Sequence, residues 1–117
     1  SFLIKDFILA KVIKKNKDKY FLLKVYKRNN KYLLVKNNKF NFLKNLNIFP
    51  MKELIKPKNF KQNINFKMSN MNMSVKIEHN NTIKAIPFSY WIDPKNLKNY
   101  TLPTFTKKIV EYLENHK

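Results

Sequence analysis

The sequence contains no cysteine and no glycine, and each absence excludes whole classes of function. Without cysteine the chain cannot build a disulfide scaffold, a thiolate metal site or a thiol nucleophile. Without glycine it cannot form the glycine-rich loops that cradle phosphates, because those loops need a positive φ and a close approach of the backbone. Thiol enzymes and the common nucleotide-binding enzymes are therefore excluded.

Acidic residues are also scarce, with 7 Asp and Glu against 25 Lys and Arg, and the net charge is +18. A charge of this size on 117 residues points to a polyanionic partner, RNA first. Lysine, asparagine and isoleucine have A/T-rich codons, so base composition explains part of the lysine excess. It does not explain the shortage of glutamate. Arg28 is the single arginine, and lysine contacts phosphate as a point charge, which favours recognition of the backbone over base edges.

Apolar residues are plentiful enough for a core. They make up 44% of the chain, including 10 Phe and 6 Tyr, which is too many for a disordered sequence. The length suits a single small domain over residues 1–117. No apolar run approaches the roughly 20 residues that cross a bilayer, so we expect no transmembrane segment.

The first part of the chain, residues 7–36, has the alternation of a basic β-meander. Strands are expected at 7–14, 20–27 and 31–36, and their short connections make neighbours antiparallel. Large apolar residues on both faces predict a sheet covered on both sides or a small barrel. Asparagine pairs occur at 29–30, 37–38 and 80–81. The two that lie between predicted strands, 29–30 and 80–81, are interpreted as turn residues, since asparagine most readily replaces glycine at positive φ. Codon bias is the alternative explanation for each pair.

The rest of the chain divides into three segments. Residues 37–62 form an irregular aromatic connection in which 51–55 suits a short helix. Residues 63–88 form a second hairpin region, with strands expected at 64–68, 71–78 and 82–86, and with a turn or bulge where the alternation changes parity at 69–70.

The C-terminal part, residues 93–117, is expected to be helical. Asp93 and Pro94 predict the start of a short helical turn, and Thr104 or Thr106 is expected to cap a last helix over about 105–115. An apolar stripe beginning at Phe105 would pack this helix on the sheet. The fold class predicted is thus α+β, mostly antiparallel β with a C-terminal helix.

Groups suited to catalysis are few and scattered. His79 precedes a predicted turn and His116 lies next to the C-terminal residue, so neither has the orienting partner that acid–base catalysis needs. Two distant histidines without cysteine do not supply a zinc site. The sequence predicts no enzyme, no metal and no cofactor or small-molecule substrate.

Cations are concentrated near the N-terminus, where Asp18 is the only acid between residues 11 and 39. Several contacts of this kind to phosphate would make binding fall steeply with salt. A solvated strand surface is the alternative interpretation. The predicted RNA-binding residues are Lys11, Lys14, Lys15, Lys17, Lys19, Lys24, Lys27, Arg28, Lys31, Lys36 and Lys39.

Aromatic residues offer two further contacts. Three tyrosines share strand faces with Lys24 and Lys36 and would permit base stacking, or are simply half-buried sheet residues: Tyr20, Tyr26 and Tyr32. A second aromatic group either closes the core beneath the last helix or contacts a protein neighbour. Its predicted protein-contact residues are Phe88, Tyr90 and Trp91.

The lysine-dominated, glycine-free composition resembles that of structural proteins of organellar ribosomes from A/T-rich organisms. The stretch from Ala10 to Arg28 is similar to the first two strands of the small-subunit ribosomal OB-fold family, in which a basic loop between strands contacts rRNA. The family's glycines are absent here, so no functional residue is carried over.

Two hypotheses follow. The first is a structural rRNA-binding component of an organellar ribosome that neutralises phosphates and contacts neighbouring ribosomal proteins. A mitochondrial location is favoured over a plastid one, and a cytoplasmic location stays open. The second is a non-catalytic accessory subunit of an organellar protein or membrane complex, whose positive charge meets an acidic partner or anionic lipid.

Overall fold

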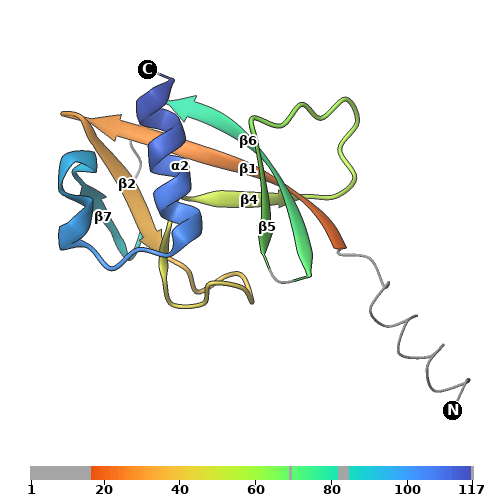
Figure 1. Ribbon diagram of the computed structural model, residues 1–117, viewed down its shortest axis with the longest axis horizontal. Helices are drawn as coiled ribbons and strands as arrows, with labels where there is room; N and C mark the ends of the chain where they lie inside the picture. Colours follow the sequence, from red (N-terminus) through yellow and green to blue (C-terminus); the bar gives the residue numbers. More distant parts are fainter. Residues whose placement is uncertain (1–16, 69, 82–84, 117) are drawn as a thin grey trace, which may run out of the picture.

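The computed structural model describes residues 17–68, 70–81 and 85–116, which form a largely antiparallel sheet with a C-terminal helix (Figure 1). The predicted α+β fold class is confirmed, and the strands of the described residues do not close into a barrel. The elements are β1 (Lys17–Arg28), β2 (Lys31–Lys36), β3 (Asn47–Ile48), β4 (Met51–Leu54), β5 (Ile64–Met68), β6 (Met71–Asn80), β7 (Ser89–Ile92), the 3₁₀ helix η1 (Pro94–Asn99) and α2 (Thr104–Asn115).

The long strand β1 organises the sheet. One edge of β1 pairs in parallel with β6, which in turn forms an antiparallel hairpin with β5. The opposite edge pairs first with β4 and then, at the hairpin tip, with β2. Strand β2 diverges from β1 and pairs with β3 and β7. We call the β4-β1-β6-β5 part the four-stranded layer.

The core lies on one face of this layer, where α2 crosses β1 (Figure 1). Alternation places Phe21, Leu23 and Val25 on this inner face, together with Val75 from β6, and all four are buried. Helix α2 presents Phe105, whose ring meets that of Phe66 edge to face at 5.2 Å. Burial of these large side chains is the main stabilising term, at about 1.5–3 kcal/mol each.

The three asparagine pairs, two of which are predicted turns, have different roles in the structure. Asn29 and Asn30 have φ of 51° and 64° and join β1 to β2, as the glycine-like interpretation predicts. Asn37 instead organises a loop through its side chain, and neither it nor Asn38 has a positive φ. Asn80 is the last residue of β6, so the third pair is not the expected hairpin turn.

Two predictions in the first half of the chain are corrected. Residues 17–19 are not a connecting loop, because they extend β1 and pair with residues 71–73 of β6. Residues 51–55 do not form a helix, because Met51–Leu54 is strand β4, held by pairing with β1. The predicted strand at 7–14 lies outside the described residues.

The segment after β6 also differs from expectation. Of the predicted strand 82–86, residues 82–84 are not among those described, and residues 85 and 86 are not in a strand. Strand β7 at Ser89–Ile92 replaces it, because the aromatic run pairs with β2 and buries Ile92. The strands predicted at 64–68 and 71–78 are confirmed as β5 and β6, which pair with each other as an antiparallel hairpin.

The C-terminal helical segments are where the sequence predicts them. Asp93 Oδ1 accepts a hydrogen bond from the Lys95 backbone N–H at 2.9 Å and caps η1, as expected. The predicted threonine cap of α2 is wrong, because Pro103 holds the cap position without a side-chain bond. Thr106 is buried instead and donates to the Asn47 carbonyl oxygen at 2.7 Å, which ties α2 to β3.

Candidate nucleic-acid-binding surface

Three of the predicted RNA-binding cations cluster at the tip of the β1–β2 hairpin. Lys27, Arg28 and Lys31 are exposed on either side of the Asn29–Asn30 turn. Lys27 Nζ lies 5.7 Å from the centre of the Tyr32 ring, a cation–π distance. The tip therefore presents three cations within a few residues. Lys11, Lys14 and Lys15 lie outside the described residues.

The remaining predicted cations are not part of this tip. Lys17 and Lys19 lie at the opposite end of β1, and Lys19 is eight strand positions, or about 26 Å, from Lys27. Lys19 Nζ is 3.3 Å from Glu53 Oε2 and is partly neutralised. Lys36 and Lys39 lie near the far end of β2. The basic run in the sequence is thus divided among separate places in the structure.

Lys24 belongs to a second group of cations that the sequence analysis missed. We call the face of the four-stranded layer turned away from α2 the outer face. Pairing register places Leu22 between Lys52 of β4 and Lys76 of β6, and Lys24 comes one step further along the same face. Lys52 and Lys76 are two strands apart, about 10 Å. The outer-face lysines are Lys24, Lys52, Lys67 and Lys76, opposed on this face by Asp18 and Glu78.

The loop between β4 and β5 adds aromatic surface and charge to the outer face. The Phe60 ring packs edge to face on Tyr20, with their centres 5.4 Å apart, and Tyr20 remains half-buried. Three exposed lysines lie on this loop: Lys56, Lys58 and Lys61. Of the tyrosines considered for stacking, Tyr26 and Tyr32 are buried, so Tyr20 is the one available on this face.

A hollow of about 530 Å³ lies beside the Tyr20–Phe60 pair and is lined mainly by polar side chains. The Asn72 amide donates to Asp18 at 3.1 Å, and the Ser74 hydroxyl donates to Asn65 at 3.3 Å. The hollow therefore combines aromatic rings with hydrogen-bonding groups. Its lining residues are Asp18, Tyr20, Phe60, Gln62, Asn65, Phe66, Lys67, Asn72, Met73 and Ser74.

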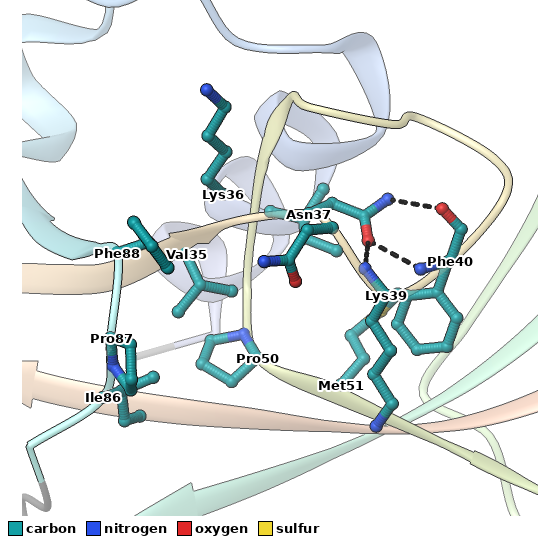
Figure 2. Close-up of a pocket in the computed structure, with 12 residues that line it drawn as sticks. Val35, Lys36, Asn37, Lys39, Phe40, Pro50, Met51, Ile86, Pro87 and Phe88 are labelled. Atoms are coloured by element: carbon teal, nitrogen blue, oxygen red, sulfur yellow. Dashed lines mark hydrogen bonds between the residues drawn. The ribbon is translucent and has the colours of Figure 1, made fainter.

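A different kind of pocket, about 440 Å³ and largely apolar, lies at the far end of β2 (Figure 2). We call it the Phe88 pocket. Lys36 and Lys39 flank it and extend in opposite directions in Figure 2, so they do not converge on a single phosphate. Its lining residues are Val35, Lys36, Asn37, Asn38, Lys39, Phe40, Ile48, Pro50, Met51, Ile86, Pro87 and Phe88.

Asn37 builds one wall of the Phe88 pocket and is only 2% exposed. Its side-chain oxygen accepts from the backbone N–H groups of Lys39 and Phe40, at 3.1 and 2.9 Å (Figure 2). Its amide nitrogen donates to the carbonyl oxygens of Phe42 and Leu43, at 2.6 and 3.1 Å. One side chain therefore holds the loop after β2 in place.

The predicted protein-contact residues differ in accessibility. Phe88 is 71% exposed at the rim of its pocket, with a φ of 58° that is rare for a bulky residue. Tyr90 and Trp91 are half-buried in β7, and the Tyr90 ring stacks on Tyr100. Burial, and secondarily Tyr100, raise the pKa of Tyr90. Phe88 is thus the most exposed of the three.

In the part of the chain that the structure describes, no three or more Asp, Glu or His residues come together in a group that could hold a metal ion. His79 is exposed, and the His116 ring stacks on Tyr112. Tyr32 donates a hydrogen bond of 2.5 Å to Glu114, and burial together with this carboxylate raises the Tyr32 pKa well above its usual range. This bond connects β2 to α2.

A signal for the outer-face lysines was present in the sequence. The alternation of 71–78 already turned Lys76 away from the core, and the lysines of 56–61 fall in a proline-interrupted segment. What the sequence did not contain was the neighbour relation of β1 with both β4 and β6, which brings these lysines beside Lys24.

Comparisons with known proteins identify the fold alone. No protein-family profile and no curated protein matches the sequence. The C-terminal domain of mouse MUTYH, solved in complex with human PCNA, is similar in structure with a TM-score of 0.58 and 17% identity, over 84% of this chain and 88% of that one. The Nudix domain of Shewanella oneidensis NrtR, solved with ADP ribose, has a TM-score of 0.58 and 9% identity, over 96% and 97%. Among the described residues, no helix is long and apolar enough to span a membrane.

Proposed function

We propose that this domain is a non-catalytic nucleic-acid-binding module that holds a single strand on the outer face of its four-stranded layer. Lysines contact the phosphates, and the Tyr20–Phe60 pair offers a surface for base stacking. The observation that carries the proposal is the outer-face group of lysines beside these two rings.

The chemistry of the face supports a strand bound without sequence preference. Proteins of this type combine a basic track with aromatic side chains, because every base has a face that can stack. Lys52 and Lys76 flank Leu22, and exposed lysines continue on the β4–β5 loop. The hairpin tip with Lys27, Arg28 and Lys31 gives a longer strand a second point of contact.

The partner favoured by composition is RNA, and we propose the rRNA of an organellar ribosome as its source. The accessory-subunit hypothesis remains the alternative. The two proteins of similar fold were solved with different kinds of partner: the MUTYH domain with the protein PCNA, and the NrtR Nudix domain with ADP ribose. ADP ribose is therefore included as a competing ligand in the test.

The test measures binding of a fluorescent 20-nucleotide single strand, as RNA and as DNA, over a range of salt concentrations. The variant Lys52→Gln/Lys67→Gln/Lys76→Gln removes three outer-face charges. For single strands each phosphate contact contributes about 0.7 to the slope of log K against log salt, so the slope should fall by about 2. Phe60→Ala should weaken binding further at every salt concentration.

A matched control removes the same charge elsewhere. Lys95 and Lys98 of η1 and Lys107 of α2 are exposed and lie outside the four-stranded layer. Their triple Gln variant should leave the slope unchanged. Equal losses in both triples would mean that net charge alone drives binding, and would reject the outer face as a site. Competition by ADP ribose at the wild-type protein would favour a nucleotide ligand instead.

A gradient sedimentation of native extract at low and high salt then addresses the source of the nucleic acid. Co-migration with ribosomal particles that is lost with the outer-face triple supports the ribosomal proposal. Migration with a detergent-extracted membrane complex would support the accessory-subunit alternative.

A further inference from the structure

The Phe88 pocket has a chemistry unlike that of the outer face. Its floor and rim are formed largely by apolar side chains, among them Ile48, Pro50 and Met51, and none of the described residues that line it is acidic. Its size falls within the range of ordinary ligand sites, which is roughly 300–1,000 Å³. A pocket of this kind gains most from burying an apolar group.

Several polar groups of the pocket wall are already engaged within the chain. Both ends of the Asn37 amide bond to the loop that follows it, and the Lys36 backbone N–H donates to the Phe88 carbonyl oxygen at 3.1 Å. A nucleobase placed here would lose water from its polar edges and find few partners, which is costly. An apolar side chain carries no such cost.

The rim adds an exposed aromatic anchor and two cations. Phe88 is 71% exposed with its backbone fixed at a positive φ, and Ser89 Oγ donates to the Ile86 carbonyl oxygen at 2.6 Å in the same turn. Lys36 and Lys39 are exposed and extend in opposite directions (Figure 2), and Lys39 Nζ lies 5.4 Å from the centre of the Phe40 ring. An occupant with acidic residues on either side of an apolar one would meet both lysines.

We propose that the Phe88 pocket binds a short acidic segment of another protein, which inserts one or two apolar side chains between Phe88 and Met51. Aromatic residues at the centre of such contacts commonly dominate binding energy. The flanking acids pair with Lys36 and Lys39 and mainly increase the rate and the salt dependence of association. This site is independent of the nucleic-acid-binding surface proposed above.

The test uses the full chain and three fluorescein-labelled hexapeptides in which Leu-Leu, Phe-Leu or Trp-Leu is flanked on each side by Asp-Glu. We expect saturable binding by fluorescence anisotropy for at least one of them. A Ser-Ser centre should abolish binding, and replacing the acids by Asn and Gln should weaken it several-fold and remove its salt dependence.

Variants of the protein locate the binding site. Phe88→Ser should weaken binding at least tenfold, and Lys36→Gln/Lys39→Gln should weaken it several-fold. Ile55→Ser is the matched control, because Ile55 is 90% exposed and lies outside the pocket, and binding should stay within twofold of wild type. Circular dichroism spectra should be the same for all variants.

Three results would overturn the proposal. The first is the absence of binding by all three acidic peptides, and the second is an equal effect of Phe88→Ser and Ile55→Ser. The third is that Phe88→Ser also loses another kind of binding, either to nucleic acid or to a second copy of the chain. Loss of single-strand binding would assign the pocket to nucleic acid, and loss of a concentration-dependent dimer in sedimentation would assign it to a second copy of the chain.

Discussion

Replacing Asn37 by alanine should destabilise the domain more than any other single change in a polar loop residue. The substitution removes five hydrogen bonds between the side chain and the backbone of residues 39–43, the longest of them 3.5 Å, from the amide nitrogen to the Phe40 carbonyl oxygen. Each such bond contributes about 1 kcal/mol net, and some of the released backbone groups will regain water. We therefore expect a loss of about 2–4 kcal/mol in the free energy of unfolding.

Urea unfolding followed by circular dichroism measures this loss. With a slope of about 1–3 kcal/mol per M, the midpoint should fall by on the order of 1–3 M. Asn38→Ala is the control, because Asn38 is adjacent but exposed, and should change stability by less than about 0.5 kcal/mol. Asn37→Asp keeps the acceptor but turns a charge toward two carbonyl oxygens, so it should be at least as damaging as alanine. Similar midpoints for Asn37→Ala and Asn38→Ala would refute the reasoning.

Two further predictions concern stability. The folded-state pKa of Tyr32 is raised, so its stabilising contribution is fully present below the unfolded tyrosine pKa of about 10 and declines as pH rises above it. Tyr32→Phe should therefore lower the free energy of unfolding by about 1.5–3 kcal/mol at pH 8, as measured by urea unfolding. The stability difference between this variant and wild type should become smaller above pH 10, and a difference that stays constant with pH would contradict the prediction. At the hairpin turn, Asn30→Ala should lower the free energy of unfolding by about 1 kcal/mol, because residue 30 has a positive φ that alanine disfavours. Asn30→Gly should leave stability unchanged or increase it. A higher melting temperature for the alanine variant than for the glycine variant would contradict the turn assignment.

Local patterns in the sequence predicted the local elements well. The alternation of Phe21, Leu23 and Val25 predicted the central part of β1, and Asn29–Asn30 predicted its turn. The β5–β6 hairpin, the 3₁₀ turn after Asp93 and the last helix were also predicted, because each depends on neighbouring residues.

The features that failed depend on distant partners. Residues 17–19 look like a polar loop but become strand because β6 pairs with them, and Met51–Leu54 is short and becomes strand because β1 pairs with it. The basic run appears continuous in sequence, yet a strand advances about 3.3 Å per residue and carries its ends apart. Asparagine serves equally as a turn residue and as a loop-organising amide, so composition could not distinguish Asn37 from Asn29.

The parallel pairing of β1 with β6 has a consequence for how the chain folds. Register partners Lys17 and Met71 are 54 positions apart, so the centre of the sheet closes only after a long loop has been brought together. Contacts of such high sequence separation slow folding, and we expect rates in the range of milliseconds to seconds rather than microseconds. During synthesis, β1 and β2 emerge first and keep their apolar inner faces uncovered until β6 and then α2 leave the ribosome. The interval before Phe105 and Ile109 arrive is therefore the period in which this protein is most exposed to aggregation.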